Sequence, residues 1–323
     1  MRILVTGVCG QLGHDVMDEL NSRGIMGMGT DILPVEKYEE KLDALHEDKY
    51  RDPYLQLDIT DEEAVEKFIE KFVPDRVIHC AAWTQVDAAE DEENKEKVYA
   101  VNVRGTENLA KACAEYEIPM TYISTDYVFD GKGEEPWEPD CTDYAPQNYY
   151  GETKLLGEQA VTGYLDDFFI VRIAWVFGKN GNNFIRTMLK LAENHDSLRV
   201  VNDQIGTPTY TYDLARLLVD MNLTEKYGYY HATNEGGFIS WYDFACEIFK
   251  EAAELKVPAV SGSGAEVDYA GVKVTPVTTA EYGLSKAARP FNSRLSKAKL
   301  TEEGFTPLPD WRDALRRYLK ELM

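Results

Sequence analysis

The 323-residue sequence lacks the features that mark a metalloprotein, a disulfide-linked secreted domain or a membrane protein. Its five cysteines are an odd number, widely spaced and without a Cys-x-x-Cys pair, which is typical of reduced, cytoplasmic thiols. The five histidines form no His-Glu-x-x-His or similar cluster, so the sequence predicts no metal site. No apolar run approaches the roughly 20 residues of a membrane span, and the first one is too short for a signal peptide. We therefore expect a cytoplasmic protein without a membrane partner.

Basic charge is also scarce. The chain has 34 Lys and Arg against 57 Asp and Glu, a formal net charge of -23. Nucleic-acid binding requires a basic surface that neutralises phosphates, so nucleic acid is excluded as a partner. An anionic small substrate would need a local set of Arg, Lys or backbone N–H groups.

Apolar strand-like runs alternate with amphipathic helical runs through the first half of the chain. Strands are expected at residues 3–6, 27–30, 76–80, 120–124 and 168–175, and helices at residues 11–22, 61–72, 95–116 and 149–163. Alternation at this spacing predicts an α/β fold with a Rossmann-type, doubly wound parallel sheet.

Two stretches depart from that rhythm. The segment Val35–Pro53 is rich in Glu, Lys and Asp and is expected to form a helical or irregular surface insertion. Beyond residue 176 the pattern becomes mixed and rich in turn residues. We therefore expect residues 1–175 to be mainly a dinucleotide-binding domain. Residues 176–323 would be mainly a smaller substrate-binding region, with some segments returning to the Rossmann core.

A glycine-rich turn separates the first expected strand from the first helix. Gly7, Gly10 and Gly13 follow a Gly-x-x-Gly-x-x-Gly spacing. The first glycine permits the tight turn, the second lets a pyrophosphate approach the backbone, and the third allows close helix–sheet packing. In this position the turn predicts dinucleotide binding. The alternative is a purely structural turn.

Two aspartates are candidates for contacts with the adenosine part of a dinucleotide. Asp31 follows the second expected strand, where it could accept hydrogen bonds from the adenosine ribose and would repel a 2′-phosphate, which favours NAD over NADP. Asp58 is placed to face the adenine. Either residue could instead be an ordinary turn aspartate.

Tyr150 and Lys154 stand four residues apart on an expected helix, so their side chains share one face. An ammonium beside a phenol favours the phenolate and is expected to lower the pKa of the phenol from about 10 towards neutrality. Such a group can exchange a proton with a substrate oxygen. By itself this spacing is also common in surface or packing pairs.

Together with a hydroxyl residue at the end of the preceding strand, either Ser124 or Thr125, these features resemble the extended short-chain dehydrogenase/reductase family. Within it the chain is most similar to the dTDP-4-dehydrorhamnose reductases. The similarity is carried by residues 6–13, 81–87, 124–129, 150–154, 175 with 181–184, 201–209 and 289–295. It covers essentially the whole chain.

The resemblance implies NADH or NADPH as coenzyme, a dTDP-sugar as substrate, and a monomer or homodimer. It assigns the coenzyme to Gly7, Gly10, Gln11, Leu12, Gly13, Asp31, Asp58, Ile59, Cys80, Ala81, Ala82, Tyr150 and Lys154. It assigns the substrate to Thr84, Thr125, Asp126, Tyr150, Trp175, Arg289 and Arg294. Asp126 could instead be a turn residue, and Trp175 could pack where the two regions meet. The insertion at Val35–Pro53 is longer than is usual in the family.

The implied reaction is reduction of the C4 ketone of dTDP-4-dehydro-L-rhamnose. Tyr150 would donate a proton to the sugar oxygen, Lys154 would hold its pKa low, and Thr125 would hydrogen-bond the same oxygen. A 4,6-dehydratase is disfavoured because Tyr127 follows Asp126 where such enzymes have Thr-Asp-Glu. Another NAD(P)-dependent nucleotide-sugar reductase, or a nucleotide-sugar 4-epimerase, remains an alternative. So does a non-catalytic subunit like the beta subunit of methionine adenosyltransferase.

Overall fold

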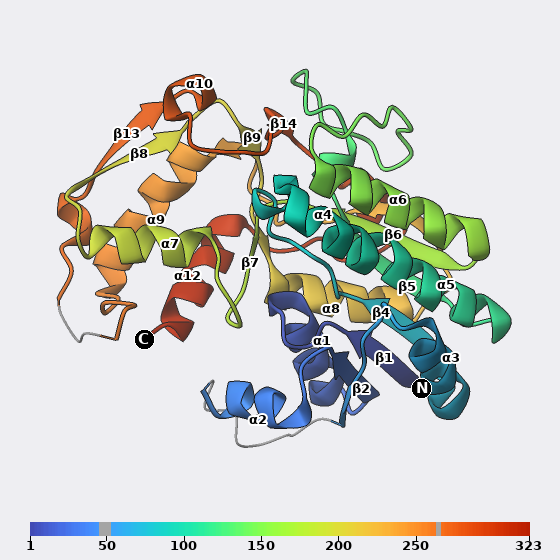
Figure 1. The fold of residues 1–323 in the computed structure, drawn as a ribbon. Coiled ribbons are helices and arrows are strands. Elements are labelled where there is room, and N and C mark those ends of the chain that lie inside the picture. The colour runs from blue at the N-terminus through green and yellow to red at the C-terminus, as the bar shows by residue number, and fades with distance from the viewer. Residues whose placement is uncertain (45–52, 263–265) are drawn as a thin grey trace.

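The structure, a computed structural model, describes residues 1–44, 53–262 and 266–323. Its centre is a sheet of seven parallel strands in the order β11-β6-β5-β4-β1-β2-β3 (Figure 1). These strands are β1 (Arg2–Thr6), β2 (Met26–Asp31), β3 (Tyr54–Gln56), β4 (Arg76–His79), β5 (Met120–Thr125), β6 (Phe168–Ile173) and β11 (Gly228–His231). The order reverses between β1 and β4, and a ligand crevice is expected there at the carboxyl ends of the strands. The predicted doubly wound α/β fold is confirmed.

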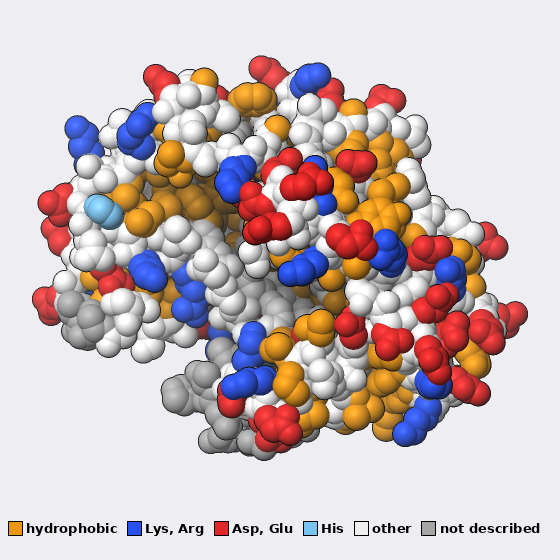
Figure 2. Space-filling model, in the orientation of Figure 1, with side chains coloured by type: hydrophobic (Ala, Val, Ile, Leu, Met, Phe, Trp, Pro, Cys, Tyr) orange, Lys and Arg blue, Asp and Glu red, His pale blue; other side chains and the backbone are white. Residues whose placement is uncertain are grey.

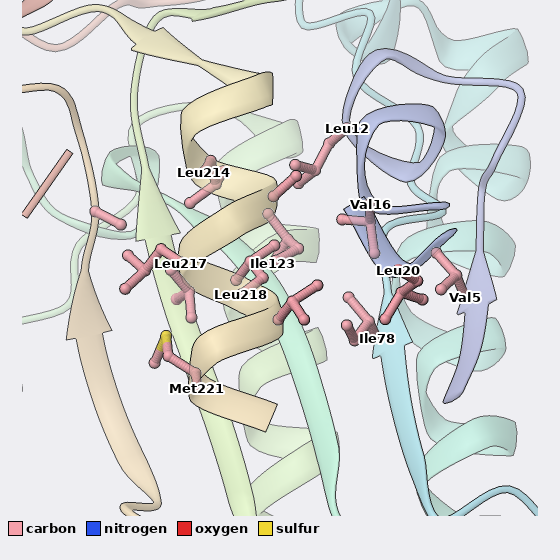
Figure 3. Close-up of a cluster of buried hydrophobic side chains, with 14 of the residues drawn as sticks. Val5, Leu12, Val16, Leu20, Ile78, Ile123, Leu214, Leu217, Leu218 and Met221 are labelled. Carbon is pink, nitrogen blue, oxygen red and sulfur yellow. The ribbon is translucent and has the colours of Figure 1, made fainter. Parts of the chain in front are cut away.

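Helices cover both faces of the sheet because both faces are apolar. On one face α1 (Gln11–Ser22) packs against α8 (Thr211–Asn222). Figure 3 shows the buried side chains between them and the strands: Val5, Leu12, Val16, Leu20, Ile78, Ile123, Leu214, Leu217, Leu218 and Met221. The other face carries α3 (Glu62–Phe72), α5 (Gly105–Glu115) and α6 (Tyr149–Tyr164).

The C-terminal half builds a second apolar core beside the sheet (Figure 1). Its short strands are β7 (Val176–Phe177), β8 (Ser197–Val201), β9 (Ile205–Gly206), β10 (Thr209–Tyr210), β12 (Ile239–Ser240), β13 (Lys273–Val277) and β14 (Asn292–Ser293). Its helices are α7 (Phe184–Ala192), α9 (Trp241–Leu255), α10 (Thr279–Tyr282), α11 (Ala298–Glu302) and α12 (Trp311–Glu321). α8 and β11 belong to the sheet and its cover although they follow residue 176.

Some predicted elements differ in extent. The strand expected through Trp175 ends at Ile173, because Trp175 has a left-handed φ of 51° that no strand continues. The helix expected from residue 95 begins at Glu92 as α4 (Glu92–Tyr99) and passes through a π-helical turn, Ala100–Arg104, into α5.

Within the expected insertion, Val35–Ala44 form helix α2, and residues 45–52 lie outside the described residues. No helix in the described ranges is long and apolar enough to cross a membrane.

Candidate active site

The turn after β1 has the geometry of a phosphate-binding loop. Gly7 has a φ of 72°, and a Cβ there would lie 2.6 Å from the backbone nitrogen of Ala81. A Cβ on Gly13 would lie 2.4 Å from the Gly7 carbonyl oxygen, so only glycine lets α1 start this close to the turn. Gly10 is the N-cap of α1, and no acidic residue occupies the first turn. The helix N-terminus therefore presents N–H groups and a positive dipole end suited to a pyrophosphate.

A cavity of about 980 Å³ runs from this turn across the carboxyl ends of the strands. Figure 2 shows it as a deep hollow between the sheet domain and the C-terminal half. Sixteen of the predicted site residues line it: Gly7, Gly10, Gln11, Leu12, Gly13, Asp31, Asp58, Ile59, Cys80, Ala81, Ala82, Thr84, Thr125, Tyr150, Lys154 and Trp175. Asp126, Arg289 and Arg294 are not among its lining residues.

The end of the cavity beyond the turn carries both predicted carboxylates. The Asp31 carboxylate accepts a hydrogen bond from the Cys9 N–H (3.0 Å). Asp58 accepts hydrogen bonds from the N–H (2.9 Å) and the hydroxyl (2.7 Å) of Thr60. Burial raises the pKa of the Cys9 thiol to about 12, so this cysteine stays protonated and unreactive. The pyrophosphate turn, the volume of the cavity and the presence of Asp31 in its lining fit a dinucleotide.

Thr125, Tyr150 and Lys154 lie together at the other end of the cavity. Thr125 ends β5, and its hydroxyl is within hydrogen-bonding reach of the Tyr150 phenol. Tyr150 and Lys154 are in the first turns of α6, which starts after Asn148 caps it by accepting from the Gly151 N–H (2.8 Å). The Lys154 ammonium lies 4.0 Å above the Tyr122 ring, an attractive cation–π contact that fixes its position.

The pKa predicted for Tyr150 from sequence is wrong in direction. Burial, followed by the nearby Asp126 carboxylate, raises the pKa of Tyr150 above its ordinary value, and the bond with Thr125 only partly offsets this. Burial also lowers the pKa of Lys154 to about 7, against the attraction of Glu158. Both groups are desolvated, and desolvation favours the neutral form of each, an effect that the spacing of the two residues does not indicate. The raised pKa makes Tyr150 a weaker acid than a free phenol, but it leaves the phenol protonated, so Tyr150 carries the proton that reduction of a ketone requires.

A buried amide holds the catalytic helix against the strand ends. Asn102, in the π-helical turn, accepts from the Trp83 N–H (2.8 Å) and donates to the Thr153 hydroxyl (3.0 Å). It thereby ties the loop after β4 to α6. Asn102 is not among the residues predicted for the site, and no pattern in the sequence indicates the π turn that aims it.

A buried ion pair behind the site was not anticipated. The Arg172 guanidinium donates to both carboxylate oxygens of Glu158 (2.9 and 2.7 Å), and both side chains are almost fully buried. Glu158 also accepts from the Ser124 hydroxyl. Both Ser124 and Thr125 line the cavity, but the Ser124 hydroxyl donates its proton to Glu158, so Thr125 is the better candidate to bond a substrate oxygen.

Asp126, Arg289 and Arg294, the predicted substrate residues that do not line the cavity, each bond other protein side chains in this structure. The buried Asp126 carboxylate accepts from the hydroxyls of Ser293 and Thr125, which joins β5 to β14. Arg289 binds Asp87 (2.6 Å) and the Tyr127 hydroxyl (3.1 Å).

Arg294 bonds the Asn292 side chain (3.0 Å) and lies over the Phe238 ring. Trp175 lines the cavity and stacks on Trp241 with ring centroids 3.7 Å apart. This position is compatible with both predictions for Trp175, contact with the substrate and packing where the two regions meet.

One local group of side chains has the composition of a possible metal site that the sequence did not predict. On α1, His14, Asp15 and Asp18 each place a potential ligand atom within 4.8 Å of the others. The three residues are not among those that line the cavity, and acidic groups of this kind are common without a metal.

The parallel sheet, the phosphate loop and the Thr–Tyr–Lys group define a Rossmann-fold oxidoreductase of the extended short-chain type. A family model described as the RmlD substrate binding domain matches residues 1–323, so the chain belongs to that family.

Among curated relatives, the spore coat polysaccharide biosynthesis protein SpsK of Bacillus subtilis is 37% identical over 99% of this chain and 97% of its own length. The dTDP-4-dehydrorhamnose reductase of Aggregatibacter actinomycetemcomitans is 38% identical over 98% of this chain and 97% of its own.

Solved structures of dTDP-4-dehydrorhamnose reductases are likewise similar to this chain over almost its whole length. A dTDP-4-dehydrorhamnose reductase from Clostridium acetobutylicum superposes with a TM-score of 0.81 at 38% identity, covering 99% of both chains. The Bacillus anthracis enzyme of that name, in complex with NADP, has a TM-score of 0.80 at 36% identity, again covering 99% of both chains.

Proposed function

We propose that this protein reduces the C4 ketone of dTDP-4-dehydro-L-rhamnose to dTDP-L-rhamnose, with NADH or NADPH as coenzyme. The observation that carries the proposal is one continuous cavity lined both by the pyrophosphate turn and by Thr125, Tyr150 and Lys154. Relatives that match almost the whole chain bear this enzyme name. We further propose that the protein acts in the cytoplasm, as a monomer or homodimer, in the supply of a nucleotide sugar for polysaccharide synthesis.

The chain's own residues divide the chemistry between them. The bound coenzyme supplies a hydride to the sugar carbonyl. Tyr150, kept protonated by its raised pKa, donates its proton to the oxygen on which negative charge grows. The Thr125 hydroxyl, which donates to Asp126 in this structure, would turn its proton to the same oxygen, so that two oriented donors would stabilise the transition state. Lys154, fixed over Tyr122, contributes positive charge beside the reacting groups when it is protonated.

The binding roles of the other residues are part of the proposal. Gly7, Gly10 and Gly13 would cradle the pyrophosphate and Asp31 the adenosine ribose. Trp175 would stack on the sugar. Arg289 would need to exchange Asp87 for a substrate phosphate, since both compete for the same guanidinium donors.

The rival functions differ at identifiable positions. A dehydratase would need an acid beside Asp126, and Tyr127 at that place bonds Arg289 instead. An epimerase retains its NAD through purification and gives no net oxidation of added coenzyme. A regulatory subunit would have no use for a complete Thr–Tyr–Lys group.

The test is coenzyme oxidation with enzymatically prepared dTDP-4-dehydro-L-rhamnose, followed by the loss of NAD(P)H absorbance. The product should be dTDP-L-rhamnose. Failure of both coenzymes to support turnover would refute the reductase assignment, and tightly retained NAD in the purified protein would then favour the epimerase.

A further inference from the structure

Helix α2 (Val35–Ala44) of the insertion packs beside the coenzyme end of the cavity. Tyr38 and Leu42 are each only 5% exposed and join the apolar core that contains Val8 and Leu12. The Tyr38 ring also stacks on Tyr54 of β3, with centroids 4.1 Å apart. These contacts fix the helix against the glycine turn and the end of β2, so a side chain on its inner face has a defined place.

That inner face delivers a positive charge to the phosphate loop. The Lys41 ammonium donates to the Cys9 carbonyl oxygen (2.8 Å), while the Cys9 N–H donates to the Asp31 carboxylate (3.0 Å). A cation and an anion therefore bracket one residue that lines the cavity. Figure 2 shows Lys and Arg side chains at this mouth of the hollow, in a molecule whose net charge is -23.

The pair matters because NADPH differs from NADH only by a phosphate on the adenosine ribose. A carboxylate that receives the ribose hydroxyls repels that phosphate. The Lys41 ammonium is bound to the carbonyl of Cys9 while the Asp31 carboxylate is bound to the N–H of the same residue, so its positive charge offsets part of that repulsion. It also has three N–H donors, of which the carbonyl of Cys9 takes one.

We propose that Lys41 is a coenzyme-specificity residue that binds the 2′-phosphate of NADPH and lets the Asp31 site accept both coenzymes. The inference rests on the proposed coenzyme site. It gives a role to the first part of the insertion, which sequence comparison with the family left without one. Removal of Lys41 would leave Asp31 alone and turn the enzyme towards NADH.

The test separates this role from catalysis by using ligands that cannot react. Calorimetric titration of the full-length protein with ADP-ribose and with 2′-phospho-ADP-ribose measures the contribution of the phosphate directly. In Lys41→Gln the amide can still donate to the Cys9 carbonyl, so packing is preserved while the charge is lost. We expect about tenfold weaker binding of the phosphorylated ligand and unchanged binding of ADP-ribose. Lys41→Arg should restore the wild-type ratio.

A matched control lies one turn away. Lys37 is exposed and pairs with Glu40 on the same helix, so Lys37→Gln should leave both affinities as they are. Equal weakening of both ligands by Lys41→Gln would overturn the proposal, since it would mean that Lys41 only holds α2 in place. An unchanged affinity for the phosphorylated ligand would overturn it as well.

The binding result does not depend on the reductase assignment. If no sugar is turned over but Lys41→Gln still weakens binding of 2′-phospho-ADP-ribose and not of ADP-ribose, the proposed reaction is wrong and the specificity role stands. If turnover is confirmed, the ratio of kcat/KM for NADPH to that for NADH should fall by the same factor as the affinity ratio.

Discussion

Replacing Lys154 with methionine should make the protein more stable while it abolishes turnover. Lys154 is buried, and burial lowers its pKa to about 7 from the ordinary value of 10.5. One pKa unit corresponds to about 1.4 kcal/mol, so holding this ammonium in the folded state costs about 5 kcal/mol near pH 6. Methionine has a similar length and no charge, so it escapes that cost.

The pH dependence is the stringent part of the prediction. Because the folded-state pKa is lowered, the unfolded chain binds more protons between about pH 7 and pH 10.5, and wild-type stability rises with pH across that window. Near pH 9 the remaining cost is about 2 kcal/mol. The stability advantage of Lys154→Met should therefore shrink by about 3 kcal/mol between pH 6 and pH 9.

Urea denaturation of both proteins at the two pH values measures this difference. Lys97→Met is the control, because Lys97 lines the same cavity but is exposed. Its effect should stay within about 0.5 kcal/mol at either pH. An advantage of Lys154→Met that is constant with pH, or a variant less stable than wild type near pH 6, would refute the reasoning.

Three further changes have defined outcomes. Tyr150→Phe should lower kcat at least ~100-fold and leave the dissociation constant of the coenzyme unchanged, and a near-normal kcat would assign proton donation to another group. Gly13→Ala places a Cβ 2.4 Å from backbone and should cost about 1–3 kcal/mol in unfolding experiments and weaken coenzyme binding, whereas Gly163→Ala, with open space around it in α6, should be neutral or stabilising. Arg172→Met strands the buried Glu158 carboxylate and should cost about 3–5 kcal/mol, and a second change, Glu158→Gln, should recover part of that loss.

Helices and strands that are defined by a local residue pattern could be predicted from the sequence. The strand and helix that flank the glycine turn were predicted to within a residue, and Gly7 and Gly13 have the close contacts that their spacing implied. Strands β3 and β11 were missed. β3 is three residues long, and β11 is defined by its pairing with β6, which only tertiary structure supplies.

The electrostatics of the site could not be read from spacing. A tyrosine and a lysine four residues apart predict proximity, but the sign of a pKa shift depends on how deeply each group is buried. The partners of Asp126 and Arg289 lie 167 and 202 residues away along the chain, at Ser293 and Asp87. Contacts between residues so far apart in the chain are not indicated by any local pattern in the sequence.

The position of β11 at the end of the sheet also sets an order of events during synthesis. The rest of the sheet ends with β6 at Ile173, whereas the helix α8 that covers α1 begins at Thr211 and the strand β11 that pairs with β6 begins at Gly228. At translation rates of about 5–20 residues per second, an emerging chain would wait several seconds with one sheet edge and one apolar face uncovered. The intervening turns and helix α7 must therefore be made before the N-terminal domain can close. A fragment ending at residue 175 would hold that incomplete state permanently.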